Sequence, residues 1–368
     1  MVRNNRGLEY GPNFCSTPLD KFRFVRADQA QGMSKRISVW ALSLTAALAG
    51  CVSTVSTVLE VENKAVQPMS SKLLAEMAKK GMTPQDPILV RIFKDESELE
   101  VWKRDRSGKY ALLKTFPMCR WSGKLGPKTK TGDRQAPEGF YNVSAGMLNP
   151  NSQYYLSFNL GYPNRLEKAL GYTGEAIMVH GACSSSGCFA LTDEGVAEIY
   201  TIAREALKGG QTAFQVQSLP FHMTPENMAR NRSNPNFEFW TNIKQGYDYF
   251  EVTKREPKVS ACGKHYAFNT EFDGGEPSDP LAPCPPSSSA GDPKVAAKQA
   301  ADTRAMEAAL QGKPEISEHA YLDGGMHPSF RALLKRRGAQ ELAKETSLTD
   351  VPISRPESAL ADPHKPGE

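Results

Sequence analysis

The segment VHGACSSSGCFALTD, from Val179 to Asp193, brings together a histidine, a cysteine and a run of small residues. His180 ends an apolar stretch typical of a buried strand, and Cys188 follows eight residues later, directly after a glycine. A cysteine sulfur attacks as a thiolate, so it needs a base within reach and hydrogen-bond donors for the oxyanion that develops. The segment supplies all of these parts and therefore predicts acyl transfer through a thioester.

Neighbouring residues complete this candidate site. We expect Gly187 to leave room for a substrate, and the backbone N–H groups of Gly187 and Cys188 to bind the oxyanion. Thr192 is a candidate N-cap of a following helix, whose N-terminus adds positive potential. Two alternatives stay open: a purely structural loop, or a zinc site formed by His180, Cys183 and Cys188, for which the nearby sequence offers no fourth ligand.

The sequence around the segment predicts a β-rich α+β domain. Runs rich in Val, Ile, Tyr and Phe, separated by turn residues, predict antiparallel strands at 88–93, 99–105, 110–116, 140–146 and 154–161. Helical spacing of apolar residues after Thr192 predicts a helix that ends at Gly209. Two further helices are expected, one starting at Thr224 and one over 237–245 that ends at Gly246.

The first 51 residues have the layout of an export signal. Residues 1–32 are a polar extension, and Met33 is a candidate true start. Residues 33–51 have a basic start, an apolar stretch and small residues before Cys51, as in a secretory signal peptide. The ending LAGC is similar to the bacterial lipobox, which implies cleavage before Cys51 and lipidation of its thiol. The alternative, a transmembrane anchor, is disfavoured by the Ser/Thr-rich stretch at 52–59.

Three further regions follow from composition. Residues 52–86 are predicted to be a tether with a short helical patch around Leu73, and residues 87–269 form the catalytic domain. Residues 270–368, rich in Pro, Ser and Ala, predict a largely disordered tail with one Ala-rich helix near 294–311.

The mildly basic net charge of +4 belongs to the predicted export region. Residues 1–51 contain seven Lys or Arg and three Asp or Glu, which leaves 38 basic and 38 acidic residues in the remainder. A nucleic-acid partner is not expected, because such proteins show a clustered basic face. The content of 39% hydrophobic and 23% charged residues excludes a wholly disordered chain.

Several motifs in order resemble the L,D-transpeptidase (YkuD-like) catalytic domain family, and within it the YafK/DpaA-like murein L,D-transpeptidase branch. The central segment has the compact loop from His-Gly to Gly-Cys of that branch. The other matching stretches, all within 87–269, are GDRQAPEGFY (132–141), YYLSFNLGYPN (154–164), FHMTPENMAR (221–230) and FWTNIKQGYDYFE (239–251). The resemblance implies a β-sandwich core with flanking helices, Cys188 as nucleophile and His180 as general base. It also implies oxyanion and support roles for Gly187, Ser186 and Gly181.

Two positions depart from the broad family. Its Ser-His-Gly-Cys motif is Ser185-Ser186-Gly187-Cys188 here, so the second histidine is absent. The Arg or Asn that the family has two residues after the cysteine is Ala190. Both changes resemble the branch, but they remove a polar and a charged group beside the nucleophile and leave the substrate open.

The family resemblance implies peptidoglycan chemistry without a metal or organic cofactor. Cys188 would attack a meso-diaminopimelate carbonyl of a stem peptide, and the acyl group would pass to an amine, giving a crosslink or attaching a protein to the wall. With water as acceptor, the same site would release a wall-bound lipoprotein. A third reading is a non-catalytic envelope lipoprotein. The expected location is the periplasm of a Gram-negative bacterium, anchored through Cys51, with stem peptides and outer-membrane lipoproteins as partners.

A basic loop and a serine are candidates for substrate binding. Lys124, Lys128, Lys130 and Arg134 form either a solvated turn or a clamp for substrate carboxylates. Of these we select Arg134, together with Ser184, as candidate substrate-binding residues.

Five cysteines remain after Cys51, an odd number that fits one free nucleophile in an oxidising compartment. Cys262 and Cys284 are a candidate disulfide pair. Cys183 is interpreted as a small packed residue, with reversible pairing to Cys188 as the alternative.

Overall fold

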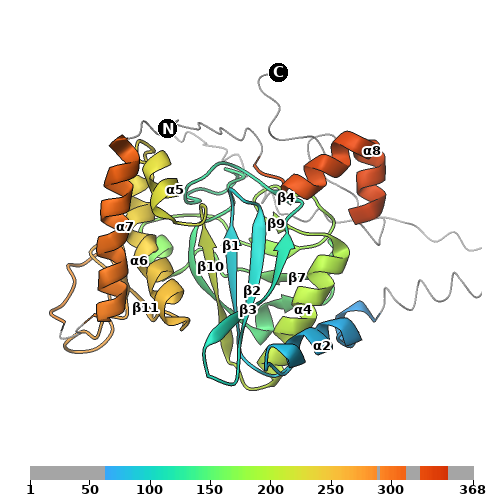
Figure 1. The fold of residues 1–368 in the computed structure, drawn as a ribbon, viewed down its shortest axis with the longest axis horizontal. Coiled ribbons are helices and arrows are strands. Elements are labelled where there is room, and N and C mark those ends of the chain that lie inside the picture. The colour runs from blue at the N-terminus through green and yellow to red at the C-terminus, as the bar shows by residue number, and fades with distance from the viewer. Residues whose placement is uncertain (1–62, 288–290, 312–323, 347–368) are drawn as a thin grey trace, which may run out of the picture. The chain divides into compact units, whose positions relative to one another are not determined.

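Two five-stranded sheets carry the fold of the computed structural model, which describes residues 63–287, 291–311 and 324–346 (Figure 1). These residues belong almost entirely to the unit 65–368, and only this unit is described. The predicted signal peptide, Cys51 and most of the predicted tether lie outside the described residues. Within the described ranges, no helix combines the length and the apolar character needed to cross a membrane.

The first sheet has the strand order β3-β2-β1-β10-β5. The pair β1–β10 is parallel and the other three pairs are antiparallel. Every residue of β1 is buried, as expected of a central strand covered on both faces. The strands are β1 (Ile88–Phe93), β2 (Glu98–Arg104), β3 (Tyr110–Pro117), β5 (Gly139–Ser144) and β10 (Ala213–Leu219).

The second sheet has the order β4-β9-β8-β7-β6 and consists of much shorter strands. The pair β8–β9 is parallel and the rest are antiparallel. Its strands are β4 (Arg120–Trp121), β6 (Leu148–Asn149), β7 (Ser157–Asn159), β8 (Met178–His180) and β9 (Phe189–Ala190), and a separate hairpin joins β11 (Val259–Cys262) to β12 (His265–Phe268). The strand predicted over 154–161 is thus only three residues long.

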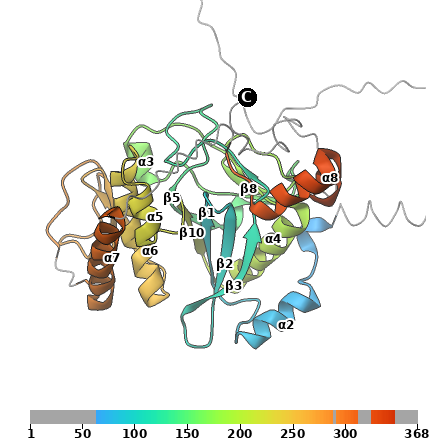
Figure 2. The same cartoon turned by 45° about the horizontal axis from the view of Figure 1, so that its top comes forward.

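The helices flank the first sheet on two sides (Figure 1 and Figure 2). Thr192 caps α4 as predicted, because its Oγ1 accepts the Gly195 N–H at 2.9 Å, and Thr224 caps α5 in the same way. The helical segments are η1 (Lys64–Val66), α2 (Ser71–Lys79), η2 (Ala145–Met147), α3 (Arg165–Ala169), α4 (Asp193–Lys208), α5 (Pro225–Arg230), α6 (Phe237–Thr253), α7 (Pro293–Gln311) and α8 (Pro328–Thr346).

Two apolar layers hold these elements together. One lies between the two sheets and α4, where the rings of Phe158 on β7 and Phe214 on β10 are 5.6 Å apart. The other lies between the opposite face of the first sheet and α6, around Phe93 and Trp240. The predicted β-rich α+β class, with helices flanking the sheets, is confirmed.

The prediction that Gly246 ends a helix is wrong. Helix α6 continues through Gly246 to Thr253. A side chain at this position would lie only 2.5 Å from the ring of Phe268 and 2.6 Å from that of Phe140. The glycine is therefore required for close packing of the helix, not for a turn.

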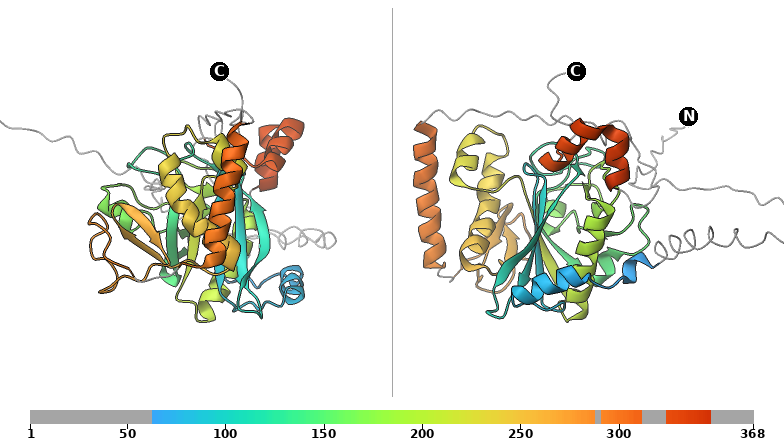
Figure 3. Two further views of the ribbon diagram at one scale, coloured as in Figure 1. Left: turned by 60° about the vertical axis from the view of Figure 1, so that its left-hand side comes forward. Right: turned by 45° about the vertical axis from the view of Figure 1, so that its right-hand side comes forward.

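The described residues after Asn269, namely 270–287, 291–311 and 324–346, contain two helices in a stretch predicted to be largely disordered. The expected Ala-rich helix is present as α7, which runs beside α5 and α6 (Figure 3). Charged side chains join α7 to α6, where Lys244 Nζ lies 2.5 Å from an oxygen of Asp302. The candidate disulfide Cys262–Cys284 is confirmed and fixes the segment that leads into α7.

A second ordered segment, residues 324–346, was not predicted and is called the C-terminal strap. Gly325 exchanges two backbone hydrogen bonds of 3.2 Å with Trp121 on β4, and the His327 N–H donates to the Met118 carbonyl. Helix α8 follows, interrupted by non-helical backbone at Gly338. Apolar residues of the strap form a small cluster of their own around Met326 and Leu342, which explains why this polar sequence is ordered.

A fully buried ion pair joins the end of β1 to the loop formed by residues 122–138. Lys94 Nζ lies 2.9 Å from Glu138 Oε1, and both side chains are 0% exposed. The ammonium also donates to the backbone carbonyls of Lys124, Gly126 and Ala136. Burial lowers the pKa of Lys94, although Glu138 acts in the opposite direction. The second oxygen of Glu138 accepts the Trp240 indole N–H from α6 at 2.7 Å.

We expect Lys94→Met to lower the free energy of unfolding by about 3–5 kcal/mol, because the Glu138 carboxylate then remains buried without its cation. The matched control is Lys114→Met, which removes a lysine from a partly exposed ion pair and should cost less than about 1 kcal/mol. Urea unfolding of both variants measures the difference. Equal effects would contradict the structural role given to Lys94.

Candidate active site

The parallel pairing of β8 and β9 brings His180 and Cys188 together. Val179 pairs with Phe189, and His180 pairs with Ala190. Extending this register by one residue places Cys188 beside Met178, and its sulfur does lie 3.4 Å from the Met178 nitrogen. Residues two apart on a strand share a face of the sheet. Cys188 and His180 therefore project from the same face of adjacent strands, as the sequence analysis requires of a nucleophile and its base.

The imidazole of His180 is held as a base. Its Nδ1 lies 2.6 Å from the Gly181 carbonyl oxygen. A carbonyl only accepts hydrogen bonds, so Nδ1 carries the proton and Nε2 keeps its lone pair. Burial lowers the pKa of His180 to about 4, despite the opposing effect of this hydrogen bond. The ring is thus neutral near pH 7, and the ring of Tyr154 contacts it at a centroid distance of 4.7 Å.

Cys188 is the one cysteine among the described residues that forms no disulfide, and it is fully buried. Its sulfur lies near the start of β8, where the Met178 N–H points at it and the Ala176 carbonyl is 3.9 Å away. Two cavities, of about 160 and 310 Å³, lie around α3 and the β11–β12 hairpin. Neither His180 nor Cys188 lines them, so neither cavity is assigned as the active site.

The two predicted oxyanion donors converge on a single point. The N–H groups of Gly187 and Cys188 both donate to Ser185 Oγ, at 3.3 and 3.1 Å. Convergence of two backbone donors is what an oxyanion requires. In this structure the Ser185 hydroxyl occupies that point, so it must turn aside before a substrate oxygen can bind there.

The backbone gives Gly187 a structural reason to be a glycine. Its φ of +132° lies in a region that side chains disfavour. A Cβ atom built here would meet its nearest protein neighbours at 3.8–4.0 Å, which is ordinary contact, so crowding by the protein is not the reason. That the missing side chain leaves room for a substrate stays a prediction.

The loop of residues 181–187, called the catalytic loop, is supported by a buried carboxylate from the first turn of α4. Asp193 is 0% exposed, and its Oδ1 accepts the Ala182 N–H at 2.8 Å. A side chain at Gly181 would come within 2.5 Å of the same oxygen, which explains the glycine after His180. An acid in the first turn of α4 is the sequence signal of Asp193, but that signal does not reveal the contact with the loop.

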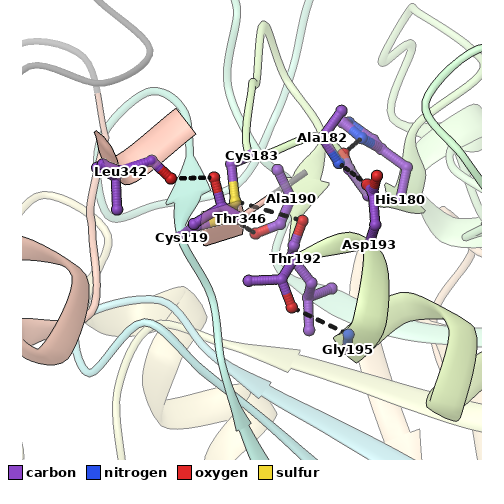
Figure 4. The surroundings of a disulfide bond; sticks show 12 residues. Cys119, His180, Ala182, Cys183, Ala190, Thr192, Asp193, Gly195, Leu342 and Thr346 are labelled. Atoms are coloured by element: carbon purple, nitrogen blue, oxygen red, sulfur yellow. Dashed lines mark hydrogen bonds between the residues drawn. A yellow bond between two sulfur atoms is a disulfide. The ribbon is translucent and has the colours of Figure 1, made fainter. Parts of the chain in front are cut away.

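A disulfide between Cys119 and Cys183 crosses from β4 to the catalytic loop (Figure 4). The prediction that Cys183 is a packed free residue, or a reversible partner of Cys188, is therefore wrong. The zinc alternative also fails, because one of its three ligands is covalently bonded to another cysteine. The surroundings of the disulfide include Leu342 and Thr346 of α8 in the C-terminal strap.

The basic residues of the predicted loop differ in burial. Lys128 is buried and forms an ion pair with Asp133, so it stabilises the loop itself. Burial alone would raise the pKa of Asp133, but hydrogen bonds from Lys128 and from backbone N–H groups lower it. Lys124, Lys130 and Arg134 are exposed. The backbone of Arg134 lies about 4 Å from the position of a Cβ on Gly187, which places this residue beside the nucleophile.

The serines of the catalytic loop lie in different environments. Ser186, a predicted support residue, is exposed, whereas Ser184, a candidate substrate-binding residue, is only 3% exposed. Ser122, which the sequence analysis did not select, lies 2.7 Å from Ser185 between the two hydroxyl oxygens. No local motif marks Ser122, because it comes from a loop 63 residues earlier in the chain.

Comparisons with known proteins agree on one family. The model of the L,D-transpeptidase catalytic domain (YkuD) matches residues 88–212. Over 183 residues, which are 50% of this chain and 74% of the relative, the chain is 42% identical to the Escherichia coli (strain K12) protein named "Putative L,D-transpeptidase YafK".

Solved structures with similarity include the helical cell shape determining protein Pgp2 from Campylobacter jejuni, with a TM-score of 0.32 and 17% identity over 65% of this chain and 77% of that chain. Bd1075 from Bdellovibrio bacteriovorus has a TM-score of 0.27 and 14% identity over 48% of this chain and 76% of that chain.

The neutral state of His180 predicts the pH dependence of turnover. Because its pKa is lowered to about 4 from 6.5, the imidazole is neutral and available as a general base above about pH 4, and it is protonated below that pH. We expect kcat/KM with a stem-peptide substrate, measured across pH, to show an acid limb near pH 4. His180→Gln should abolish that limb, and the exposed His265→Gln should leave it in place. An acid limb near 6.5 in the wild-type protein would contradict the buried base.

Proposed function

Because the chain belongs to the family of L,D-transpeptidase catalytic domains, we propose that it transfers acyl groups of peptidoglycan stem peptides through a thioester on Cys188. The observation that carries the proposal is the pairing of β8 with β9. This register supports a position for Cys188, which forms no disulfide, on the same side of the strand pair as a histidine whose Nδ1 bond to a carbonyl leaves the Nε2 lone pair available. The family acts on peptidoglycan peptides, and the attacked group is expected to be a meso-diaminopimelate carbonyl.

In the proposed first half-reaction, His180 Nε2 takes the thiol proton as the Cys188 sulfur attacks the carbonyl carbon. The Ser185 hydroxyl turns aside, and the N–H groups of Gly187 and Cys188 bind the oxyanion. As the tetrahedral intermediate collapses, the C–N bond breaks and His180 returns the proton to the leaving amine. The product is a thioester on Cys188, and no metal or organic cofactor takes part in this scheme.

The second half-reaction repeats these steps with a new nucleophile. His180 removes a proton from the acceptor, the acceptor attacks the thioester, and the thiol is regenerated. An amine acceptor gives a crosslink or attaches a protein to the wall. The alternative acceptor is water, which would release a wall-bound lipoprotein. We favour the amine because the family is one of transpeptidases.

Arg134 is the residue proposed to bind a carboxylate of the stem peptide. Its exposed side chain extends from backbone that adjoins Gly187, and no hydrogen bond or ion pair within the described residues uses its guanidinium. A φ of +55° at a non-glycine residue is uncommon and marks a position that the loop holds in place. Arginine binds carboxylates in a bidentate manner, which suits this role.

We propose that the protein acts in the periplasm, held at a membrane through a lipid on Cys51. Two disulfides in the described residues, Cys119–Cys183 and Cys262–Cys284, support an oxidising compartment. Outer-membrane lipoproteins are then within reach as acceptors or substrates. Metabolic labelling with a fatty acid should tag the wild-type chain and not Cys51→Ser, and equal labelling would overturn the lipid anchor.

The central test incubates the protein with muropeptides, some carrying a lipoprotein remnant, and analyses the products by mass spectrometry. New dimers linked between two diaminopimelate residues are expected, and Cys188→Ala should form none while retaining its melting temperature. Loss of the remnant without dimers would instead establish hydrolysis. Unchanged wall composition in cells that carry only Cys188→Ala would favour a non-catalytic envelope protein.

Arg134→Ala should raise KM for the muropeptide about tenfold or more, because a charged hydrogen bond is worth about 1.5–3 kcal/mol. Since Arg134 is not assigned to the reacting atoms, kcat should change little. Lys124→Ala, an exposed lysine of the same loop, is the matched control. If both variants have the same KM as the wild-type protein, Arg134 does not bind the substrate.

A further inference from the structure

Strand β4 is flanked by two residues that hold the catalytic loop at separate points. Cys119, before the strand, forms the disulfide with Cys183, and Ser122, after the strand, forms the 2.7 Å hydrogen bond with Ser185. We propose that Cys119 and Ser122 are positioning residues, which act through Cys183 and Ser185 to set the orientation of the base and of the oxyanion donors. This inference rests on the proposed function, because it assumes that Cys188 and His180 are the reacting pair.

The disulfide is placed where it controls the orientation of His180. One peptide unit, between Gly181 and Ala182, offers its carbonyl to His180 Nδ1 and its N–H to Asp193. Ala182 and Cys183 then have φ angles of +64° and +48°. Two consecutive non-glycine residues in this region are disfavoured and persist when the surroundings enforce them. The bond from Cys183 to Cys119 is a covalent constraint directly after that peptide unit.

Further constraints act on the same turn. The Cys183 N–H donates to the Leu191 carbonyl at 3.2 Å, and the Cys119 N–H donates to the Ala190 carbonyl at 3.1 Å. The disulfide therefore connects two residues that are each fixed to the chain segment beyond Cys188. The bond ties the catalytic loop at Cys183 to the residue before β4 and so holds the histidine end of the loop beside the segment that follows Cys188.

The serine pair sets the other end of the loop. Ser185 uses its one hydroxyl hydrogen on the Cys188 carbonyl at 2.6 Å, so Ser122 must donate to Ser185. Ser185 Oγ also receives the N–H groups of Gly187 and Cys188. The Ser122 hydroxyl thus fixes the group around which both donors converge.

Strand β4 is itself held by hydrogen bonds on both edges, so Cys119 and Ser122 extend from a fixed strand. On one edge Arg120 and Trp121 pair with Ala190 and Phe189 of β9. On the other edge Trp121 exchanges hydrogen bonds with Gly325 of the C-terminal strap. The Trp121 side chain is 0% exposed, and its indole N–H donates to Ser97 at 3.0 Å.

The test compares two variants of the full chain, each of which lacks one of the two disulfides. Cys119→Ala/Cys183→Ala, called the clamp variant, removes the disulfide between the β4 region and the catalytic loop. Cys262→Ala/Cys284→Ala, the control, removes the disulfide in the β11–β12 region. For each we measure the melting temperature, the iodoacetamide rate of Cys188 across pH, and muropeptide turnover. We expect the clamp variant to lose at least tenfold in kcat, with KM within threefold. The acid limb of its muropeptide turnover, measured across pH, should move from near pH 4 toward 6.5 as the imidazole becomes hydrated. The control variant should keep kcat and KM within twofold of the wild-type values, and its acid limb should stay near pH 4.

A clamp variant that melts as a folded protein, yet retains the wild-type kcat and acid limb, would overturn the proposal. Ser122 provides a second test that does not depend on folding without a disulfide. Ser122→Ala should lower kcat at least fivefold, and Ser122→Thr, which keeps the hydroxyl, should restore it to within twofold. Equal kcat for Ser122→Ala and the wild-type protein would likewise overturn its role.

Failure of the proposed function gives a different result. If Cys188 is not the catalytic nucleophile, Cys188→Ala retains turnover. The alkylation profiles still report whether removal of the Cys119–Cys183 bond or of the Ser122 hydroxyl changes the environment of Cys188 and His180. Retained turnover in Cys188→Ala therefore refutes the nucleophile, whereas unchanged alkylation profiles in the clamp variants refute the positioning.

Discussion

The ion pair between Lys94 and Glu138 is the interaction on which the arrangement around the site depends. It lies where β1, the 122–138 loop and α6 meet, and the ammonium uses its hydrogen bonds to gather three loop carbonyls. The same ammonium lies 5.0 Å from the centre of the Trp121 ring on β4. Lys94, at the end of β1 in the first sheet, therefore contacts both the loop that carries Arg134 and strand β4, which borders the catalytic loop.

The reacting pair is assembled by the second, smaller sheet. Its strands have only two or three residues, so few ladder hydrogen bonds hold it together. Contacts outside the ladder also hold the catalytic loop in place. They are the Asp193 carboxylate, the Cys119–Cys183 disulfide and the hydrogen bond between Ser122 and Ser185. With such short strands, His180 is the last residue of β8 and Cys188 directly precedes β9, and the added contacts supplement the few ladder hydrogen bonds around them.

The sequence predicted the local features of the site and missed those that join distant segments. His180 and Cys188 lie in one segment with recognisable strand, turn and cap signals, and the helix capped by Thr192 was located correctly. Cys119 and Ser122 lie more than 60 residues from their partners, and no spacing rule links them. Gly246 shows the same limit: glycine usually ends helices, and only the rings of Phe140 and Phe268 reveal why this helix continues through it. The strap was missed because its apolar cluster is too small to alter the polar composition of the tail.

The C-terminal strap covers a strand edge that could otherwise pair with another chain. Strand β4 is the last strand of its sheet, and without residues 324–327 its outward backbone groups would be unsatisfied. An open strand edge is a template for another chain, and natural sheets cover such edges to avoid self-association. The strap thus gives β4 an intramolecular partner, so that an extended peptide meets an edge whose backbone groups are already hydrogen-bonded.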